Sequence, residues 1–88
     1  MALTGMDVSA VRTLANQLSA KADEIETIAG SLSSQLDGTQ WLGADADSFR
    51  GDWQNTHRTQ LQNVAGALRD ASTRASQNAT QQEQASSS

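Results

Sequence analysis

The chain has 88 residues, no cysteine, no proline and a formal net charge of -4. This length limits it to one small domain, and the lack of cysteine excludes disulfides and thiolate metal sites. The negative net charge argues against nucleic acid as a partner, because its binding depends on neutralising phosphates with Lys and Arg. The six basic residues are scattered and form no patch for an anionic membrane.

Residues 1–6 are expected to form a short N-terminal arm. They have neither the basic start nor the apolar run of a signal peptide. No stretch of the sequence is long and apolar enough to predict a transmembrane helix, so we expect no stable membrane insertion. A secreted form of the protein would have to leave the cell without a cleaved signal peptide, after a cytoplasmic stage.

The apolar residues that follow the arm recur in steps of three and four, which predicts an amphipathic helix over about 7–37. Asp7 is the expected N-cap, and Gly38 is the expected left-handed closing residue. The stripe contains Val8, Val11, Ala15, Leu18, Ala22, Ile25, Ala29, Leu32 and Leu36, and it is widened by Leu14 and Ile28. It is wider than one neighbouring helix can cover.

A turn is expected over about 38–43, followed by a second helix over 44–75 or slightly beyond. Asp45 and Asp47 place negative charge in its first turn, where the helix dipole favours it. Its stripe contains Ala46, Phe49, Trp53, His57, Leu61, Val64, Leu68, Ala71 and Ala75. From Ser76 the sequence is mainly polar, so residues 76–88 are predicted to form a flexible tail.

Two long helices joined by a short connection should fold back on each other, which predicts an all-α, antiparallel helix-turn-helix hairpin. The expected register pairs Leu32 with Phe49, Ile25 with His57, and Leu18 with Val64. A lone hairpin would expose a long apolar seam to water, so two hairpins are expected to dimerise into a four-helix bundle. The predicted core and dimer interface contains Val11, Leu14, Leu18, Ile25, Ile28, Leu32, Leu36, Phe49, Trp53, His57, Leu61, Val64 and Leu68.

No constellation of residues indicates catalysis, a cofactor or a metal. His57 has no second His or Cys to complete a metal site, and it is interpreted as a packed or interface residue, with a weak pH sensor as the alternative. Asp45 and Asp52 share a helix face and are interpreted as part of a solvated helix start. No Ser or Thr has a base at a plausible spacing, so no enzyme is predicted.

The turn Trp41-Leu42-Gly43, placed between two long helices and followed by Phe49 and Trp53, resembles the WXG family. These are the early secretory antigenic target-like, or Esx, proteins exported by type VII secretion systems of Gram-positive bacteria. The resemblance covers about residues 7–75. It implies a homodimer, or a heterodimer with another WXG-family protein, that is exported folded and recognised by a secretion ATPase. Trp41 and Gly43 match the turn motif of the family.

The chain departs from the family at its C-terminal end. The family carries a Tyr-x-x-x-Asp/Glu export signal, whereas this sequence has no Tyr and reads Ala75 to Ala79 or Ser76 to Thr80 at those positions. The chain would then depend on a partner's signal or be recognised as a homodimer in another way. After export it would act as effector, carrier or structural partner. The alternative is a cytoplasmic helical adaptor or chaperone-like partner of a larger secreted protein or toxin.

Overall fold

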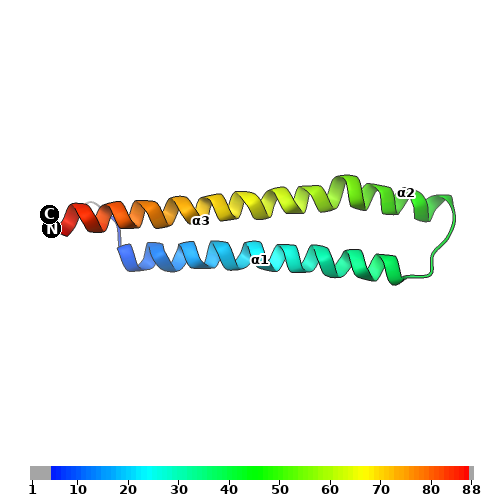
Figure 1. Cartoon of the computed structure of the whole chain (residues 1–88), viewed down its shortest axis with the longest axis horizontal. Coiled ribbons are helices and arrows are strands. Elements are labelled where there is room, and N and C mark those ends of the chain that lie inside the picture. Colours follow the sequence, from blue (N-terminus) through cyan, green and yellow to red (C-terminus); the bar gives the residue numbers. More distant parts are fainter. Residues whose placement is uncertain (1–4, 88) are drawn as a thin grey trace.

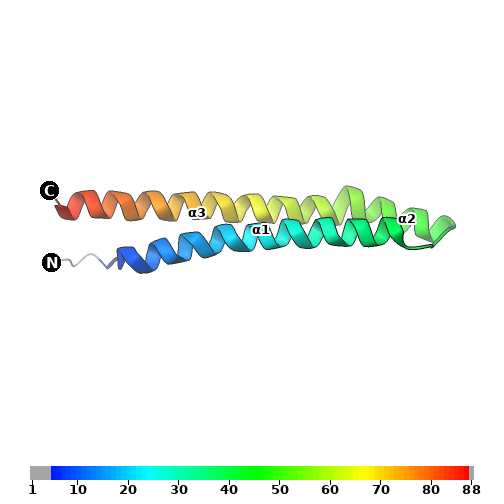
Figure 2. The same cartoon turned by 60° about the horizontal axis from the view of Figure 1, so that its bottom comes forward.

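The computed structural model describes residues 5–87 as a helical hairpin with overall dimensions of 66 × 17 × 15 Å (Figure 1). The first arm is α1 (Val8–Gly38). The second arm consists of α2 (Ala44–Asp52), the π-helical segment η1 (Trp53–His57) and α3 (Arg58–Ser87). The arms run antiparallel (Figures 1 and 2), and the described residues contain no strand. The predicted all-α hairpin is therefore confirmed, and its dimerisation stays a prediction.

The start of α1 follows the predicted capping pattern, and its end does not. The Asp7 carboxylate accepts a hydrogen bond of 3.0 Å from the Ala10 amide, as expected for an N-cap. Gly38, however, is the last helical residue and is not left-handed. The helix ends at Thr39, which has an extended backbone and whose amide donates to the Leu36 carbonyl at 3.2 Å. Arg50 of the second arm donates to the same Leu36 carbonyl, and the Thr39 hydroxyl donates to the Gln35 carbonyl at 2.6 Å, so two of the terminal carbonyls are bound without a left-handed residue.

The seam between the arms is made of small side chains. The buried hydrophobic residues are Ala15, Ala22, Ala29, Ala46, Ala65 and Ala79. Ala15, Ala22 and Ala29 are seven residues apart on α1, and Ala65 and Ala79 are twice seven residues apart on α3. A seven-residue repeat returns to the same side of a helix every two turns, as in helices that pack along a shared seam. Ser72 lies midway between Ala65 and Ala79, and its hydroxyl donates to the Ala15 carbonyl on the other arm at 2.6 Å. Small residues therefore form the core, and the larger residues of the predicted core lie beside it.

The predicted register is wrong by about one and a half helical turns. The Trp53 indole N–H donates to Ser33 Oγ at 2.9 Å, whereas the predicted register placed Trp53 near Ile28. Two features explain the shift. Figure 1 shows that the loop carries the start of α2 beyond the end of α1, and η1 adds a residue to one turn of the second arm.

The π-helical segment also changes which side chains of the second arm face α1. His57 was predicted to face Ile25, but it is exposed. The wider turn makes a five-residue step, so Arg58 instead comes next to the first arm, half-buried, after Trp53. The Arg58 Nε atom is buried without a hydrogen-bond partner among the described residues.

The second arm continues as helix through Ser87, so the flexible tail predicted from Ser76 is not observed. Gln occurs four times in residues 76–88 and is a good helix former. Ala79 is fully buried, and the Arg12 side chain of α1 contacts Glu83 and donates to Thr80 at 3.3 Å. Tertiary contacts thus hold a segment whose composition alone predicts disorder. Most of the predicted N-terminal arm (1–4) and residue 88 lie outside the described residues.

Candidate interaction site at the hinge end

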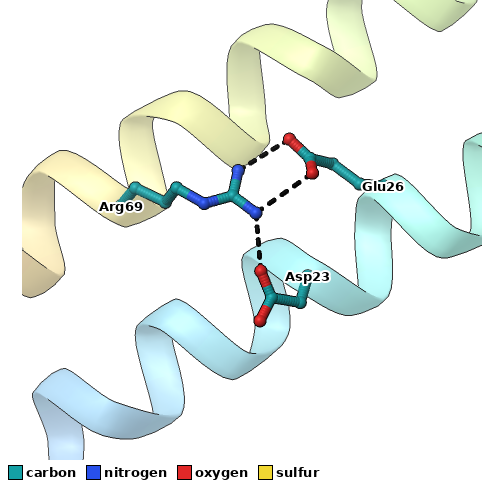
Figure 3. Close-up of polar contacts among 3 residues, drawn as sticks. All are labelled: Asp23, Glu26 and Arg69. Carbon is teal, nitrogen blue, oxygen red and sulfur yellow. Dashed lines mark hydrogen bonds and ion pairs between the residues drawn. The ribbon is translucent and has the colours of Figure 1, made fainter.

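One side of the hairpin is held together by arginine. Arg69 on α3 donates to Glu26 at 2.7 and 3.1 Å and to Asp23 at 2.6 Å on α1 (Figure 3). These bonds, to Glu26 first and then Asp23, raise the pKa of Arg69. Arg12 repeats the pattern with the arms exchanged, because it bridges Thr80 and Glu83, which are likewise three residues apart. We call this side the clamped face.

The other side of the hairpin exposes large apolar side chains. Asp23 lies about 100° to one side of Ala22 around α1, whereas Leu14 and Leu32 lie about 80° to the other side. We define the apolar face by its most exposed large residues, which are Leu14 (52% exposed), Ile28 (53%), Leu32 (44%), Phe49 (51%) and Val64 (48%). Apolar surface of this extent along one side of a small protein is typical of an interaction site.

A groove lies at the hinge end of the apolar face. This hinge groove has a volume of about 350 Å³ and is lined by Leu32, Gln35, Leu36, Thr39, Trp41, Phe49 and Trp53. The rings of Trp41 and Phe49 pack with their centroids 5.3 Å apart and their planes tilted by 54°, a favourable aromatic geometry. Ser33 accepts from the Trp53 indole and donates to the Ala29 carbonyl at 2.9 Å. The polar edge of Trp53 is thus satisfied, which leaves its ring to line the groove.

Gly43 connects the hinge loop to α2. Its φ of 117° and ψ of 179° form a conformation that residues with a Cβ rarely adopt. The Gly43 carbonyl accepts from the Asp47 amide at 3.0 Å and so begins the helix. The motif glycine therefore has a backbone role in this structure.

Arg50 joins the loop to the end of α1. Its Nη1 donates to the Trp41 carbonyl at 2.7 Å, and its Nη2 donates to the carbonyls of Thr39 at 3.0 Å and Leu36 at 3.3 Å. The guanidinium carbon lies 6.0 Å from the centroid of the Trp41 ring. Sequence reasoning missed this residue because its partners are backbone carbonyls, which carry no residue-type signal.

The structure distributes the predicted interface residues over three settings. Four of them, Leu32, Leu36, Phe49 and Trp53, line the hinge groove together with the motif residue Trp41. Five are half-buried along the rod, namely Val11, Leu18, Ile25, Leu61 and Leu68. Leu14, Ile28, Val64 and His57 are exposed. A second groove, lined by Leu14, Leu18, Ala67, Asp70, Ala71, Arg74, Ala75 and Asn78, continues the apolar surface away from the hinge.

Within residues 5–87 no group of three His, Cys, Asp or Glu side chains could hold a metal ion. No helix in the same part of the chain is long and apolar enough to span a bilayer. Comparison with known proteins found no matching family model, curated protein or solved structure.

Proposed function

We propose that this chain is a non-enzymatic interaction subunit of the WXG (Esx) type, exported as a folded dimer by a type VII secretion system. In that system it serves as effector, carrier or structural partner. The observation that carries the proposal is the apolar face that runs along one side of a helical hairpin and ends in the hinge groove, next to Trp41 and Gly43. A hairpin with one apolar side and one clamped side is suited to pair with a second hairpin.

The partner in the proposed dimer is a second copy of this chain or another WXG-family protein. Pairing would remove from water the apolar side chains that a lone hairpin exposes, and this burial is favourable at about 25 cal/mol per Å². Trp41 lies in the hinge loop and is not among the residues that define the apolar face, so it would remain near the tip of the assembly, where a secretion ATPase could contact it. Trp is enriched at binding hot spots, so Trp41 is the proposed recognition residue.

Export is tested in a bacterium that carries the gene together with a type VII system. The tagged protein should appear in the culture supernatant when the secretion ATPase is intact and disappear when the ATPase is inactivated. A cytoplasmic marker measured in the same samples controls for lysis. Unchanged release without the active ATPase would refute the export proposal.

A second candidate function is a cytoplasmic helical adaptor or chaperone-like partner of a larger secreted protein or toxin. The lack of Tyr favours it, because the export signal of the family requires one. Native mass spectrometry separates the two functions. The protein alone, or mixed with the product of a neighbouring gene of similar length, should give a dimer under the first proposal. A large partner of unrelated sequence and no dimer of small hairpins would favour the adaptor.

A further inference from the structure

Arg50 donates hydrogen bonds to three backbone carbonyls at the hinge. The end of α1 and the loop present the carbonyls of Leu36, Thr39 and Trp41 toward one point. The Leu36 carbonyl also accepts from the Thr39 amide at 3.2 Å, whereas the Thr39 and Trp41 carbonyls belong to the loop that follows α1. Hydrogen bonds to a charged donor such as a guanidinium are stronger than those between neutral groups. The guanidinium contacts all three carbonyls, so one side chain fixes three peptide units of the hinge.

The contacts of Arg50 require the shape of arginine. Its two terminal nitrogens reach different carbonyls while the planar group lies 6.0 Å from the Trp41 ring centroid. Lysine has a single terminal nitrogen and no planar group, so it cannot reproduce both the fork of donors and the placement over the ring. Among the ion pairs of the described residues, none involves Arg50, so charge pairing does not account for its position.

Two adjacent residues of the loop differ in how much of their surface is exposed. Leu42, next to Trp41, is 86% exposed, whereas Trp41 is 38% exposed. The Trp41 ring packs on Phe49 on one side, and its own carbonyl is bound by Arg50. Trp41 is therefore less exposed than Leu42 because two residues of α2, Phe49 and Arg50, contact it.

We propose that Arg50 is the positioning residue of the hinge, which fixes the loop so that the Trp41 ring stays folded against Phe49 at the mouth of the hinge groove. Arginine is required there, and lysine does not replace it. The relevance of this role to recognition rests on the proposed function, in which Trp41 contacts the partner. The positioning itself is a property of the single chain and is measured without any partner.

The test uses the full chain labelled with 5-fluorotryptophan and observed by fluorine NMR. The chain has two tryptophans, so Trp41→Phe and Trp53→Phe assign the two signals. In Arg50→Lys and Arg50→Gln the Trp41 signal should move toward its position in the unfolded chain, while the Trp53 signal should shift much less. In a Trp53→Phe background, acrylamide quenching of Trp41 should rise about twofold, because a released ring gains most of the surface that is now covered.

Arg69→Lys is the matched control, because it alters an arginine contact between the arms far from the hinge. It should leave the Trp41 signal in place, and circular dichroism should show that the helix content of every variant is kept. A Trp41 signal that is unchanged in Arg50→Lys, or that moves equally in Arg69→Lys, would overturn the positioning role. A response confined to the Arg50 variants would support it even if the wild-type protein proved to be monomeric and not exported, so the two proposals fail separately.

Discussion

Gly43 combines a φ of 117° with a ψ of 179°, a conformation that costs a residue with a Cβ on the order of 1–3 kcal/mol. We therefore expect Gly43→Ala to lower the free energy of unfolding by that amount, measured by urea denaturation at fixed protein concentration. The loss should not be relieved by a local change of the backbone, because Gly43 is also the N-cap residue at which α2 begins.

Gly38→Ala is the control for the Gly43 prediction. Gly38 is helical, and a Cβ built on it meets no atom within 4 Å. Alanine should therefore leave the free energy of unfolding unchanged or raise it by up to about 1 kcal/mol. Equal losses in the two variants would mean that backbone conformation is not the cause.

Arg69 should stabilise the hairpin by a salt-sensitive contact that is insensitive to pH in the neutral range. Its pKa is raised on folding, so on the alkaline side its contribution is fully present below the pKa of the unfolded chain and is lost as pH rises through the higher pKa of the folded chain, far above neutral pH. Arg69→Gln should lower the Tm, and the loss should shrink as salt is increased from low to molar concentration. Differential scanning calorimetry at several salt concentrations checks this.

Arg74→Gln serves as the comparison for Arg69, because the side chain of Arg74 makes no ion pair or hydrogen bond with another described residue. Its Tm should change little at any salt concentration. If the Tm of Arg69→Gln were lowered by the same amount at every salt concentration, Arg69 would stabilise the hairpin through the packing of its side chain instead.

At the scale of the helices, the fold could be predicted from sequence more fully than the contacts between its arms. Steps of three and four define a helix whichever apolar residues occupy them, so α1 was placed to within one residue at each end. Periodicity does not say which part of a wide stripe faces the other arm. In the structure Ala22 and the alanines seven residues before and after it face the other arm, because small side chains let two helices approach most closely. The leucines remained at the flank.

The alanine seam gives a prediction about packing. Ala22 is fully buried, so Ala22→Leu would place extra methylenes between the arms and should lower the free energy of unfolding by about 1–3 kcal/mol. Ala20 is exposed on the same helix, and Ala20→Leu should have little effect. Urea denaturation compares the two variants, and similar losses in both would contradict a tightly packed seam.

The π-helical segment could not be predicted from the apolar stripe. His57 follows Trp53 by four residues, the step of a regular α-helix, whereas Arg58 follows it by five, the step of a π-helical turn, and the stripe does not distinguish the two. Removing Asn55 from η1 should convert the second arm to a regular α-helix. The hinge side of α2 would then rotate by about 100° relative to α3. The bond between Trp53 and Ser33 should break, and the near-UV circular dichroism of tryptophan should decrease.

Asn55→Ala keeps the number of residues and controls for loss of the side chain. It should retain the near-UV signal, because η1 can still form. If the deletion variant kept the wild-type spectrum as well, the register would not depend on the extra residue of η1.

For the whole molecule, the separation of a clamped face from an apolar face determines where a partner can bind. Ile28 lies near the middle of the apolar face and is 53% exposed in the single chain. In the proposed dimer Ile28→Glu would bury an unpaired charge and should raise the Kd by at least about tenfold. Sedimentation equilibrium measures this change.

Asn16 is exposed and lies on the flank of α1 that leads to the clamped face. Asn16→Glu adds the same charge outside the proposed interface and should leave the Kd within about twofold. A wild-type protein that stays monomeric at high micromolar concentration, or equal weakening by the two variants, would rule out the apolar face as the dimer interface.

The residues of the candidate site could be predicted from the sequence better than the contacts that hold the hinge loop in place. Trp41, Gly43, Phe49 and Trp53 were identified from the motif and its spacing, and they meet at the hinge. Arg50 was not identified, since its position depends on where three loop carbonyls converge in space. Such convergence is set by the path of the loop, which no local pattern in the sequence encodes.

The hairpin brings the start of α1, at Val8, and the end of α3, at Ser87, to one end of a rod 66 Å long, and the loop between α1 and α2, which contains Trp41, lies at the other end (Figures 1 and 2). A fluorescent label or a passenger domain attached near either of these residues would therefore be held tens of ångströms from the aromatic tip, about a full helix length away. Such fusions could report on binding at the tip without blocking it. A natural chain joined at the same end would leave the tip free in the same way.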